Sequence, residues 1–240
     1  MKVSIDVVEL KKESKKLLDG NTWVLFLCNV CFLGILALVG SVVFFIPNPL
    51  EKILTNLFIE KGFANINLEW IVWGFFMFIR SIIFVAFVYP FYVCLSTVPL
   101  AIVNNEEIEV SNIFKPICKV RYFVEYAVAG VQKYLFTILW FLVLIFPSIV
   151  AYYRYSFTKY ILATENDTTA GDAIRKSKNL TYGNKSSMFS IDLSFIGWLF
   201  IGIITCGVGL IFVIGYHEVV CALQYKKILQ NQIVEKVENQ

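Results

Sequence analysis

The stretch "LIFPSIVAYYRYSFTKY", residues 144–160, decides how many times the chain crosses a membrane, because it carries a proline and two cations within an apolar segment. Proline lacks the backbone N–H that a helix needs, so it predicts a sharp turn at residues 146–148. If the chain turns there, residues 148–164 return as a separate span that contains Arg154 and Lys159. Without the turn, the chain crosses once here and the basic loop that follows lies on the other side.

The composition of the 240-residue chain is that of a membrane protein. Hydrophobic residues make up 58% of it and charged residues 16%, whereas soluble domains have about 45–50% and about 25%. The net charge is only +3 and no long Lys/Arg run occurs, which excludes the extended basic surface that nucleic-acid binding requires. We therefore expect an all-α polytopic transmembrane helix bundle with no nucleic-acid partner.

Long apolar runs define the other predicted spans. The first, residues 22–46, has no charge; it is long enough for a crossing helix of about 20 residues and too long for a signal-peptide core of about 7–15. A second run covers residues 70–92, and a third ends at Phe146. The last block, residues 188–225, is cut by "TCGVG" (205–209), whose glycines predict a tight helical hairpin. The total is about six spans, with two tight hairpins.

The distribution of Lys and Arg sets the orientation. Cytoplasmic loops carry an excess of these residues, and most of the 21 in this chain fall in the leader, near residues 115–133 and 175–185, and in the C-terminal segment. We therefore predict a multi-pass protein of the cell membrane with both termini cytoplasmic and external turns at residues 146–148 and 206–208. A four-span protein with re-entrant hairpins fits the same charges and remains an alternative.

The chain is predicted to be a single integral membrane domain. Residues 1–21 form a basic amphipathic cytoplasmic leader, residues 22–225 the transmembrane bundle with a cytoplasmic amphipathic helix at 170–180, and residues 226–240 a cytoplasmic tail. The leader and this helix interleave cations with apolar residues, so we expect both to lie on the inner leaflet near anionic lipids. The candidate lipid-headgroup contacts are Lys11, Lys12, Lys15, Lys16, Arg175, Lys176 and Lys178.

The helix at residues 170–180 has its own start and stop signals. Thr169 followed by Asp172 suits a helix start, and Gly183 suits a stop. Its less polar face is formed by Ala170, Ala173, Ile174, Ser177 and Leu180. A topology signal without any lipid contact is the alternative explanation for its cations.

Charged residues within the predicted spans form a candidate intramembrane polar cluster. Its members are Arg80, Arg154, Lys159, His217 and Glu218. An unpaired charge at the bilayer centre costs about 2.5–3.5 kcal/mol, so charges of opposite sign at the same depth should meet. Counting about 1.5 Å per residue from the predicted external turns places Arg80, Lys159 and Glu218 at similar depth near mid-membrane. We therefore expect Glu218 to contact Arg80 or Lys159, with His217 and Tyr155 nearby. Separate solvation of the two cations is the alternative.

Catalytic, metal and cofactor motifs are not found in the sequence. "HEVVC" (217–221) begins like a zinc-protease motif, but Cys221 stands where the second histidine is expected. One His and one Cys leave a metal site short of ligands. Cys28 and Cys31 form a C-x-x-C within a predicted span, without the surroundings that activate a thiol. We therefore expect no catalytic residue, no metal, no cofactor and no enzymatic activity.

Four segments resemble a known bacterial membrane family. They are "GNTW" (20–23), "LWFLVLIFPSIVAYYRYSFTKYILA" (139–163), "AGDAIRKSKNLTYGNKSSMF" (170–189) and "LSFIGWLFIGIITCGVGLIFVIGY" (193–216). Over nearly the whole chain they resemble the integral membrane family called domain of unknown function 975, and more loosely the membrane domain of bacterial glycerophosphodiesterases. Ser148 and Gly215 differ from the usual residues. The resemblance implies a multi-span bacterial membrane protein with no established reaction.

Three functional classes follow from these observations. The first is a non-enzymatic protein that acts through lipid or partner contacts in the cytoplasmic membrane, including protection against envelope stress or antimicrobial peptides. The second is a small transporter or channel that uses its intramembrane charges. The third is an intramembrane enzyme, for which the sequence offers no nucleophile and base pair. We favour the first class, with anionic membrane lipids as partners.

Overall fold

The computed structural model describes residues 6–45, 49–60, 68–109, 113–143, 145–165, 167–205 and 207–238. In this part of the chain the regular elements are all helices, which confirms the all-α class. They are α1 (Val7–Leu18), α2 (Thr22–Phe45), α3 (Pro49–Glu60), α4 (Leu68–Leu95), α5 (Thr97–Asn104), the 3-10 helix η2 (Lys115–Cys118), α7 (Val120–Val143), α8 (Ile145–Arg154), α9 (Thr158–Thr164), α10 (Ala170–Leu180), α11 (Lys185–Ile204) and α12 (Val208–Glu238).

Four stretches among the described residues are long and apolar enough to cross a membrane. They are Thr22–Phe44, Trp70–Asn104, Lys185–Ile204 and Val208–Val234. Many of their large apolar side chains are exposed, among them Phe200 at 64% and Ile204 at 80%. Water-soluble monomers rarely expose apolar surface on this scale, so these helices are those expected of a membrane protein. The count of six spans stays a prediction.

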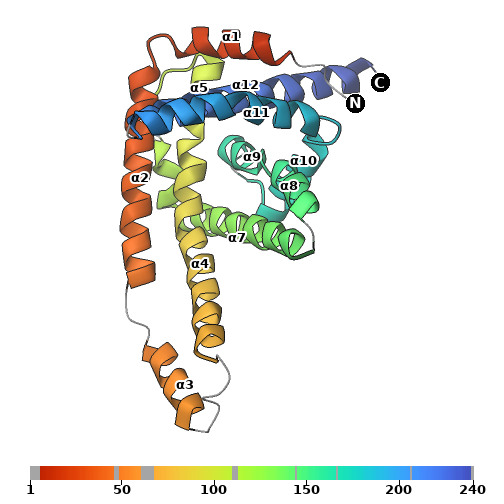
Figure 1. Cartoon of the computed structure of the whole chain (residues 1–240). Helices are drawn as coiled ribbons and strands as arrows, with labels where there is room; N and C mark the ends of the chain where they lie inside the picture. The colour runs from red at the N-terminus through yellow and green to blue at the C-terminus, as the bar shows by residue number, and fades with distance from the viewer. Residues whose placement is uncertain are drawn as a thin grey trace.

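Figure 1 shows two pairs of long helices that run crosswise to each other. α2 and α4 lie side by side, with α3 at one end of this pair. α11 and α12 form the second pair, and α1 packs along α12. α8, α9 and α10 lie between the second pair and α7. The long helices therefore do not form one parallel bundle, and their crossing brings α4, α9 and α12 together.

A glycine lets α7 pack directly on α4. A Cβ atom built on Gly130 would lie 2.5 Å from the Cβ of Tyr89, a distance that real side chains do not tolerate. About one helical turn further along, the hydroxyl groups of Tyr134 and Ser81 form a hydrogen bond of 2.8 Å between the same two helices. This close crossing holds the end of α4 that carries Tyr92 against the centre of the molecule.

The segment after α7 differs from the predicted single span. α7 ends at Val143, and α8 begins at Ile145 and packs back on α7, so the predicted reversal of the chain is present. It lies just before residues 146–148, which belong to the first turn of α8. Proline is tolerated there because the N–H that it lacks would have no partner in the first turn. α8 ends at Arg154, and a turn at residues 155–157 separates it from α9, which begins at Thr158. Lys159 therefore belongs to a separate short helix.

The hairpin between α11 and α12 contains the predicted glycine turn. Gly207 has a φ of +86°, in the left-handed region that strains residues with a Cβ. Its N–H donates to the carbonyl of Gly202 at 3.2 Å, and Gly202 leaves room for the side chain of Leu210. Residue 206, which belongs to the predicted turn, lies outside the described residues.

α1 packs on protein with the face that was expected to meet lipid. Leu10 and Leu18 on this face are buried, and the helix contacts α5, α11 and α12. An ion pair between Glu13 and Lys227 adds to the contact with α12. α12 itself continues as one helix to Glu238, through most of the residues predicted as a cytoplasmic tail; the side of the membrane on which they lie stays a prediction.

α10 has the predicted cap and the predicted face. Thr169 Oγ1 accepts a hydrogen bond of 3.2 Å from the N–H of Asp172, and Gly183 beyond the helix has a φ of +80°. The buried residues are Ala170, Ala173, Ile174, Ser177 and Leu180. This face packs against α7 and α9, so only the exposed cations of α10 remain for lipid.

Candidate functional site

A small polar cavity lies where α4, α7, α8, α9, α11 and α12 meet. Its volume is about 60 Å³, which is room for a few water molecules, since one needs about 10–15 Å³. Its ionisable lining residues are Tyr92, Lys133, Tyr152, Tyr153, Lys159, Tyr160, Asp192, His217, Glu218 and Cys221. Lys159, His217 and Glu218 of the predicted polar cluster thus share one cavity.

An ion pair between Lys159 and Glu218 forms one wall of the cavity. The Lys159 side chain is 7% exposed and that of Glu218 is 20% exposed. The hydroxyl of Tyr92 donates to Glu218 Oε1 at 3.0 Å, and the hydroxyl of Tyr160 donates to Oε2 at 3.1 Å. A buried carboxylate is tolerated only when charge and hydrogen bonds compensate for its lost hydration. Both kinds of compensation are present here.

Two aromatic rings flank the ammonium group of Lys159. Its Nζ lies 4.4 Å from the ring centroid of Tyr92 and 4.8 Å from that of Tyr160, within the range of a cation–π interaction. Nζ also donates to the hydroxyl of Tyr92 at 2.6 Å. Tyr92 comes from α4, Tyr160 from α9 and Glu218 from α12. The site therefore depends on the crossing of α4, from the first helix pair, with α12, from the second.

The other predicted members of the cluster lie elsewhere. Arg80 donates to the carbonyl of Phe44 at 3.2 Å and so links α4 to α2. Arg154 ends α8, where its carbonyl accepts a hydrogen bond of 3.0 Å from Ser177. Tyr155, expected near Glu218, instead stacks on Phe136 with a centroid distance of 5.8 Å. Tyr155 is not among the residues that line the cavity, although Tyr153 and Ser156 beside it are.

A second polar group on the cavity wall joins α11 to α12. His217 Nε2 lies 2.7 Å from Asp192 Oδ1, and the hydroxyl of Tyr153 donates to Asp192 Oδ2 at 2.7 Å. Cys221 Sγ lies 3.7 Å from His217 Nε2. His217 and Cys221 alone are too few ligands for a metal; the fold adds Asp192, which is distant in sequence.

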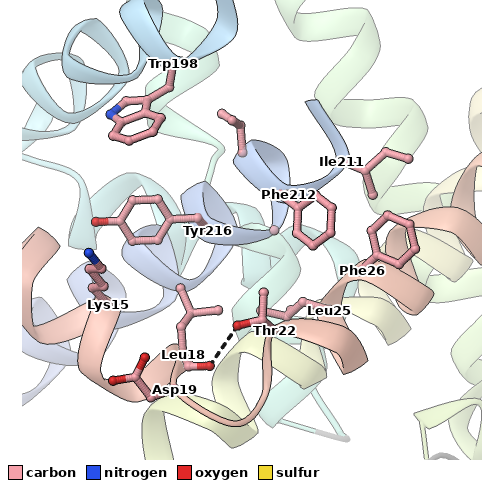
Figure 2. Close-up of a pocket in the computed structure, with 12 residues that line it drawn as sticks. Lys15, Leu18, Asp19, Thr22, Leu25, Phe26, Trp198, Ile211, Phe212 and Tyr216 are labelled. Carbon is pink, nitrogen blue, oxygen red and sulfur yellow. Dashed lines mark hydrogen bonds between the residues drawn. The ribbon is translucent and has the colours of Figure 1, made fainter. Parts of the chain in front are cut away.

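A larger pocket of about 330 Å³ lies between α1, α2, α11 and α12. Figure 2 shows the polar groups of Lys15, Asp19 and Tyr216 toward one end and the rings of Phe26 and Phe212 toward the other. These two rings stack with a centroid distance of 4.7 Å. The pocket is therefore amphipathic, with an apolar body and a charged end.

The turn between α1 and α2 forms the floor of this pocket. Thr22 Oγ1 donates to the carbonyl of Leu18 at 3.1 Å, as Figure 2 shows. Gly20 in this turn has a φ of +91°, which explains why a glycine follows the basic leader. The pocket was not predicted from the sequence, because four separate segments form it; the "GNTW" motif (20–23) is a local sequence signal beside it.

The predicted headgroup contacts differ in exposure. Lys11 is half-buried, whereas the other six, Lys12, Lys15, Lys16, Arg175, Lys176 and Lys178, are exposed. Arg175 pairs with Asp172 at 2.7 Å, and Lys176 pairs with Glu165. These pairs leave part of the charge of α10 neutralised within the protein.

Lys11 and Glu165 have shifted pKa values. Lys11 Nζ donates to the carbonyl of Ser194 at 3.0 Å and lies 4.2 Å from the ring centroid of Phe195, and burial lowers the pKa of Lys11. Burial alone would raise the pKa of Glu165, but the hydrogen bonds from Lys176 and Thr168 outweigh it and lower that pKa. The ammonium group of Lys11 thus contacts protein groups, and that of Lys176 pairs with the carboxylate of Glu165.

Comparison with known proteins gives one match. No curated protein and no solved structure matches the chain. A family model does match, over the part that contains about half of α7, all of α8 to α11 and the greater part of α12. Residues 131–232 match the family described as Protein of unknown function (DUF975), which confirms the family resemblance for this part of the chain.

Proposed function

We propose that this chain is a multi-pass protein of the bacterial cytoplasmic membrane that binds a membrane phospholipid without transforming it. The observation that carries the proposal is the amphipathic pocket between α1, α2, α11 and α12. Its volume of about 330 Å³ lies at the lower end of the range of about 300–1,000 Å³ that small-molecule sites occupy. An acyl-chain segment suits its apolar body.

The charges at the polar end match a phospholipid headgroup. The ammonium group of Lys15 suits the lipid phosphate, since cations near an anionic membrane surface are stabilised by about 1 kcal/mol each. The carboxylate of Asp19 lies at the same end of the pocket and suits the ammonium of a zwitterionic headgroup. Lys12 and Lys16 are exposed on the same helix and add positive potential.

A tryptophan next to the pocket supports a position of its polar end at the level of the lipid headgroups. Trp23 is 69% exposed and begins α2 together with Thr22. Its ring lies 5.6 Å from that of Phe26 and 6.2 Å from that of Phe212. Exposed tryptophans favour the membrane–water interface, so the polar end of the pocket is at headgroup level and the two phenylalanines lie deeper.

The proposal includes both termini on the cytoplasmic side. The pairing of Glu13 with Lys227, and the hydrogen bond of 3.0 Å from Lys226 to the carbonyl of Val103, support a common side for α1, the end of α5 and the C-terminal part of α12. The Lys/Arg distribution favours six spans. The alternative, four spans in which the α7–α9 segment enters and leaves the membrane on one side, also places both termini on the same side.

Photo-crosslinking tests lipid binding. The full chain is reconstituted with a phospholipid that carries a diazirine in its acyl chain. We expect preferential labelling of peptides around Phe26 and Phe212. Ile211→Trp, which fills the pocket, should abolish this labelling, whereas Ile203→Trp, on the exposed surface of α11, should leave it unchanged. Equal labelling of the two peptides in both variants would contradict the proposal.

A role in resistance to envelope stress follows from lipid binding as a cellular expectation. Cells that express the unmodified chain should survive a pore-forming peptide better than cells that express the Ile211→Trp variant. Equal survival at equal membrane abundance would show that lipid binding in this pocket is not what protects the cells.

A small transporter is the second candidate function. The polar cavity with its Lys159–Glu218 pair favours it, because buried ionisable residues in membrane proteins mark ion and substrate pathways. Ion flux into proteoliposomes that Glu218→Gln abolishes would support this function. Flux at the level of empty liposomes would exclude it for the ions tested.

A further inference from the structure

We propose that Asp192, His217 and Cys221 form a binding site for a divalent transition metal ion of the zinc type on the wall of the polar cavity. One carboxylate oxygen, one imidazole nitrogen and the thiol sulfur lie within 4.8 Å of one another. None of the three residues lines the amphipathic pocket, so the proposal does not depend on lipid binding.

Helix geometry explains how the three ligands meet. His217 and Cys221 are four residues apart on α12, and this spacing puts both side chains on the same face of the helix. α11 packs antiparallel against α12 after the turn at Gly207 and brings Asp192 to that face. Two rigid helices rather than a loop therefore carry the site, which fixes the ligands before an ion arrives.

Side-chain rotations within the cluster bring the distances to those of a tetrahedral ion. Bonds of about 2.0–2.3 Å from zinc to N, O and S place neighbouring ligand atoms roughly 3.3–3.6 Å apart. Cys221 Sγ lies 3.7 Å from His217 Nε2 and 3.8 Å from Nδ1, so it sits over the ring, and a rotation of the imidazole is needed to aim Nε2 at a shared ion. Asp192 Oδ1 is closer, at 2.7 Å from Nε2, because the two form a hydrogen bond. Rotation of the carboxylate at the end of its short side chain opens this distance.

Neighbouring side chains orient two of the ligands. The hydroxyl of Tyr153 donates to Asp192 Oδ2 at 2.7 Å and leaves Oδ1 facing His217. The ring of Phe195 meets the imidazole of His217 edge to face at a centroid distance of 4.9 Å. Such outer partners hold metal ligands in place and raise metal affinity.

The donor set and its charge select the class of ion. Thiolate and imidazole favour zinc and related transition metals, whereas magnesium and calcium need oxygen ligands. A thiolate and a carboxylate together neutralise a divalent cation, which matters where hydration is poor. The Lys159 ammonium on the same cavity wall already has Glu218 as its counter-charge. Three protein ligands leave the fourth position open to the cavity.

Cobalt titration of the full chain tests the site. The protein is purified in detergent through a tag without histidine, stripped with a chelator and titrated with Co²⁺, whose bond to a thiolate gives a charge-transfer band. We expect one Co²⁺ per chain, displaced by Zn²⁺. Cys221→Ser should lose the band, the matched control Cys28→Ser should keep it, and Asp192→Asn should weaken binding at least about tenfold.

Alkylation of the unmodified chain provides a measurement that needs no variant. Zn²⁺ should slow the modification of Cys221 by a small maleimide and leave that of Cys28 unchanged. Equal rates for Cys221 with and without Zn²⁺ would overturn the proposal. A charge-transfer band that survives in Cys221→Ser, or equal affinity in Asp192→Asn, would overturn it as well, because the Asp192–His217 pair would then be a hydrogen bond without a metal role.

Discussion

Lys159 and Glu218 form a buried ion pair that joins the short helix α9 to α12, and the hydroxyls of Tyr92 and Tyr160 donate to the same carboxylate. Arg80, the other cation expected at this depth, instead binds the carbonyl of Phe44 at 3.2 Å. Because Lys159 is 7% exposed, removal of Glu218 would leave its charge buried without a counter-charge.

Glu218→Gln should lower the free energy of unfolding by about 3–5 kcal/mol, since breaking a buried ion pair from one side leaves an uncompensated charge. The double variant Lys159→Gln/Glu218→Gln should recover part of this loss. Thermal unfolding in detergent, read by circular dichroism, measures both effects. The control pair Arg80→Gln/Glu218→Gln should show additive losses, and additive losses for Lys159 as well would refute the pairing.

Gly130→Ala should destabilise the protein by about 1–3 kcal/mol, because overpacking forces helices apart. The new Cβ would lie 2.5 Å from the Cβ of Tyr89, and the α4–α7 crossing leaves no alternative position. Gly74→Ala is the matched control, since nothing lies within 4 Å of its Cβ. It should be neutral or slightly stabilising, by up to about 1 kcal/mol, through helix propensity. The same unfolding assay compares the two variants.

Lys15→Gln should reduce the amount of phospholipid that the purified chain retains by roughly fivefold, which corresponds to the loss of about 1 kcal/mol per cation. Native mass spectrometry after exchange into mixed anionic and zwitterionic lipid measures retention. Lys12→Gln, exposed on the same helix but outside the pocket, should have a smaller effect. Asp19→Asn should shift retention toward the anionic lipid; no shift would remove Asp19 from headgroup recognition.

Lys178→Cys in a cysteine-less background should resist a membrane-impermeant maleimide in intact cells and react after the membrane is opened. The expectation follows from the positive-inside distribution, and Lys178 is exposed on α10. Labelling of intact cells would reverse the orientation. Ile149→Cys, near the start of α8, separates the two span counts, because external labelling there fits six spans.

Glu165→Gln should cost less than about 1 kcal/mol of stability at neutral pH, because the Glu165–Lys176 pair is largely exposed and screened by solvent. The pKa of Glu165 is lowered in the folded chain, with burial opposing and the hydrogen bonds from Lys176 and Thr168 causing the shift. A depressed carboxylate pKa stabilises the fold above the unfolded value of about 4.3 and loses this effect as the pH falls through the folded value. The melting temperatures of the two proteins should therefore converge at low pH; a constant difference would contradict the assignment.

Local patterns determined the features that depend on one segment. The hydropathy of residues 22–46 and 188–225 indicated membrane helices, because a helix that crosses lipid must be apolar over its own length. The helical period gave the buried face of α10 correctly, and Gly207 marked its hairpin because only glycine adopts that backbone conformation easily. The proline marked the reversal between α7 and α8 but not its exact position, because residues 146–148 fit into the first turn of the following helix.

Only the tertiary structure decided which segments meet. Counting residues placed Arg80 and Lys159 at the same depth, and the turn before α9 together with the crosswise packing of α4 and α12 selected Lys159 as the partner of Glu218. The same packing of α11 on α12 brought Asp192 to His217. Depth along a helix is a property of its own sequence, whereas the direction in which a side chain meets a neighbour depends on helix rotation and crossing, which the contacts of the whole chain set.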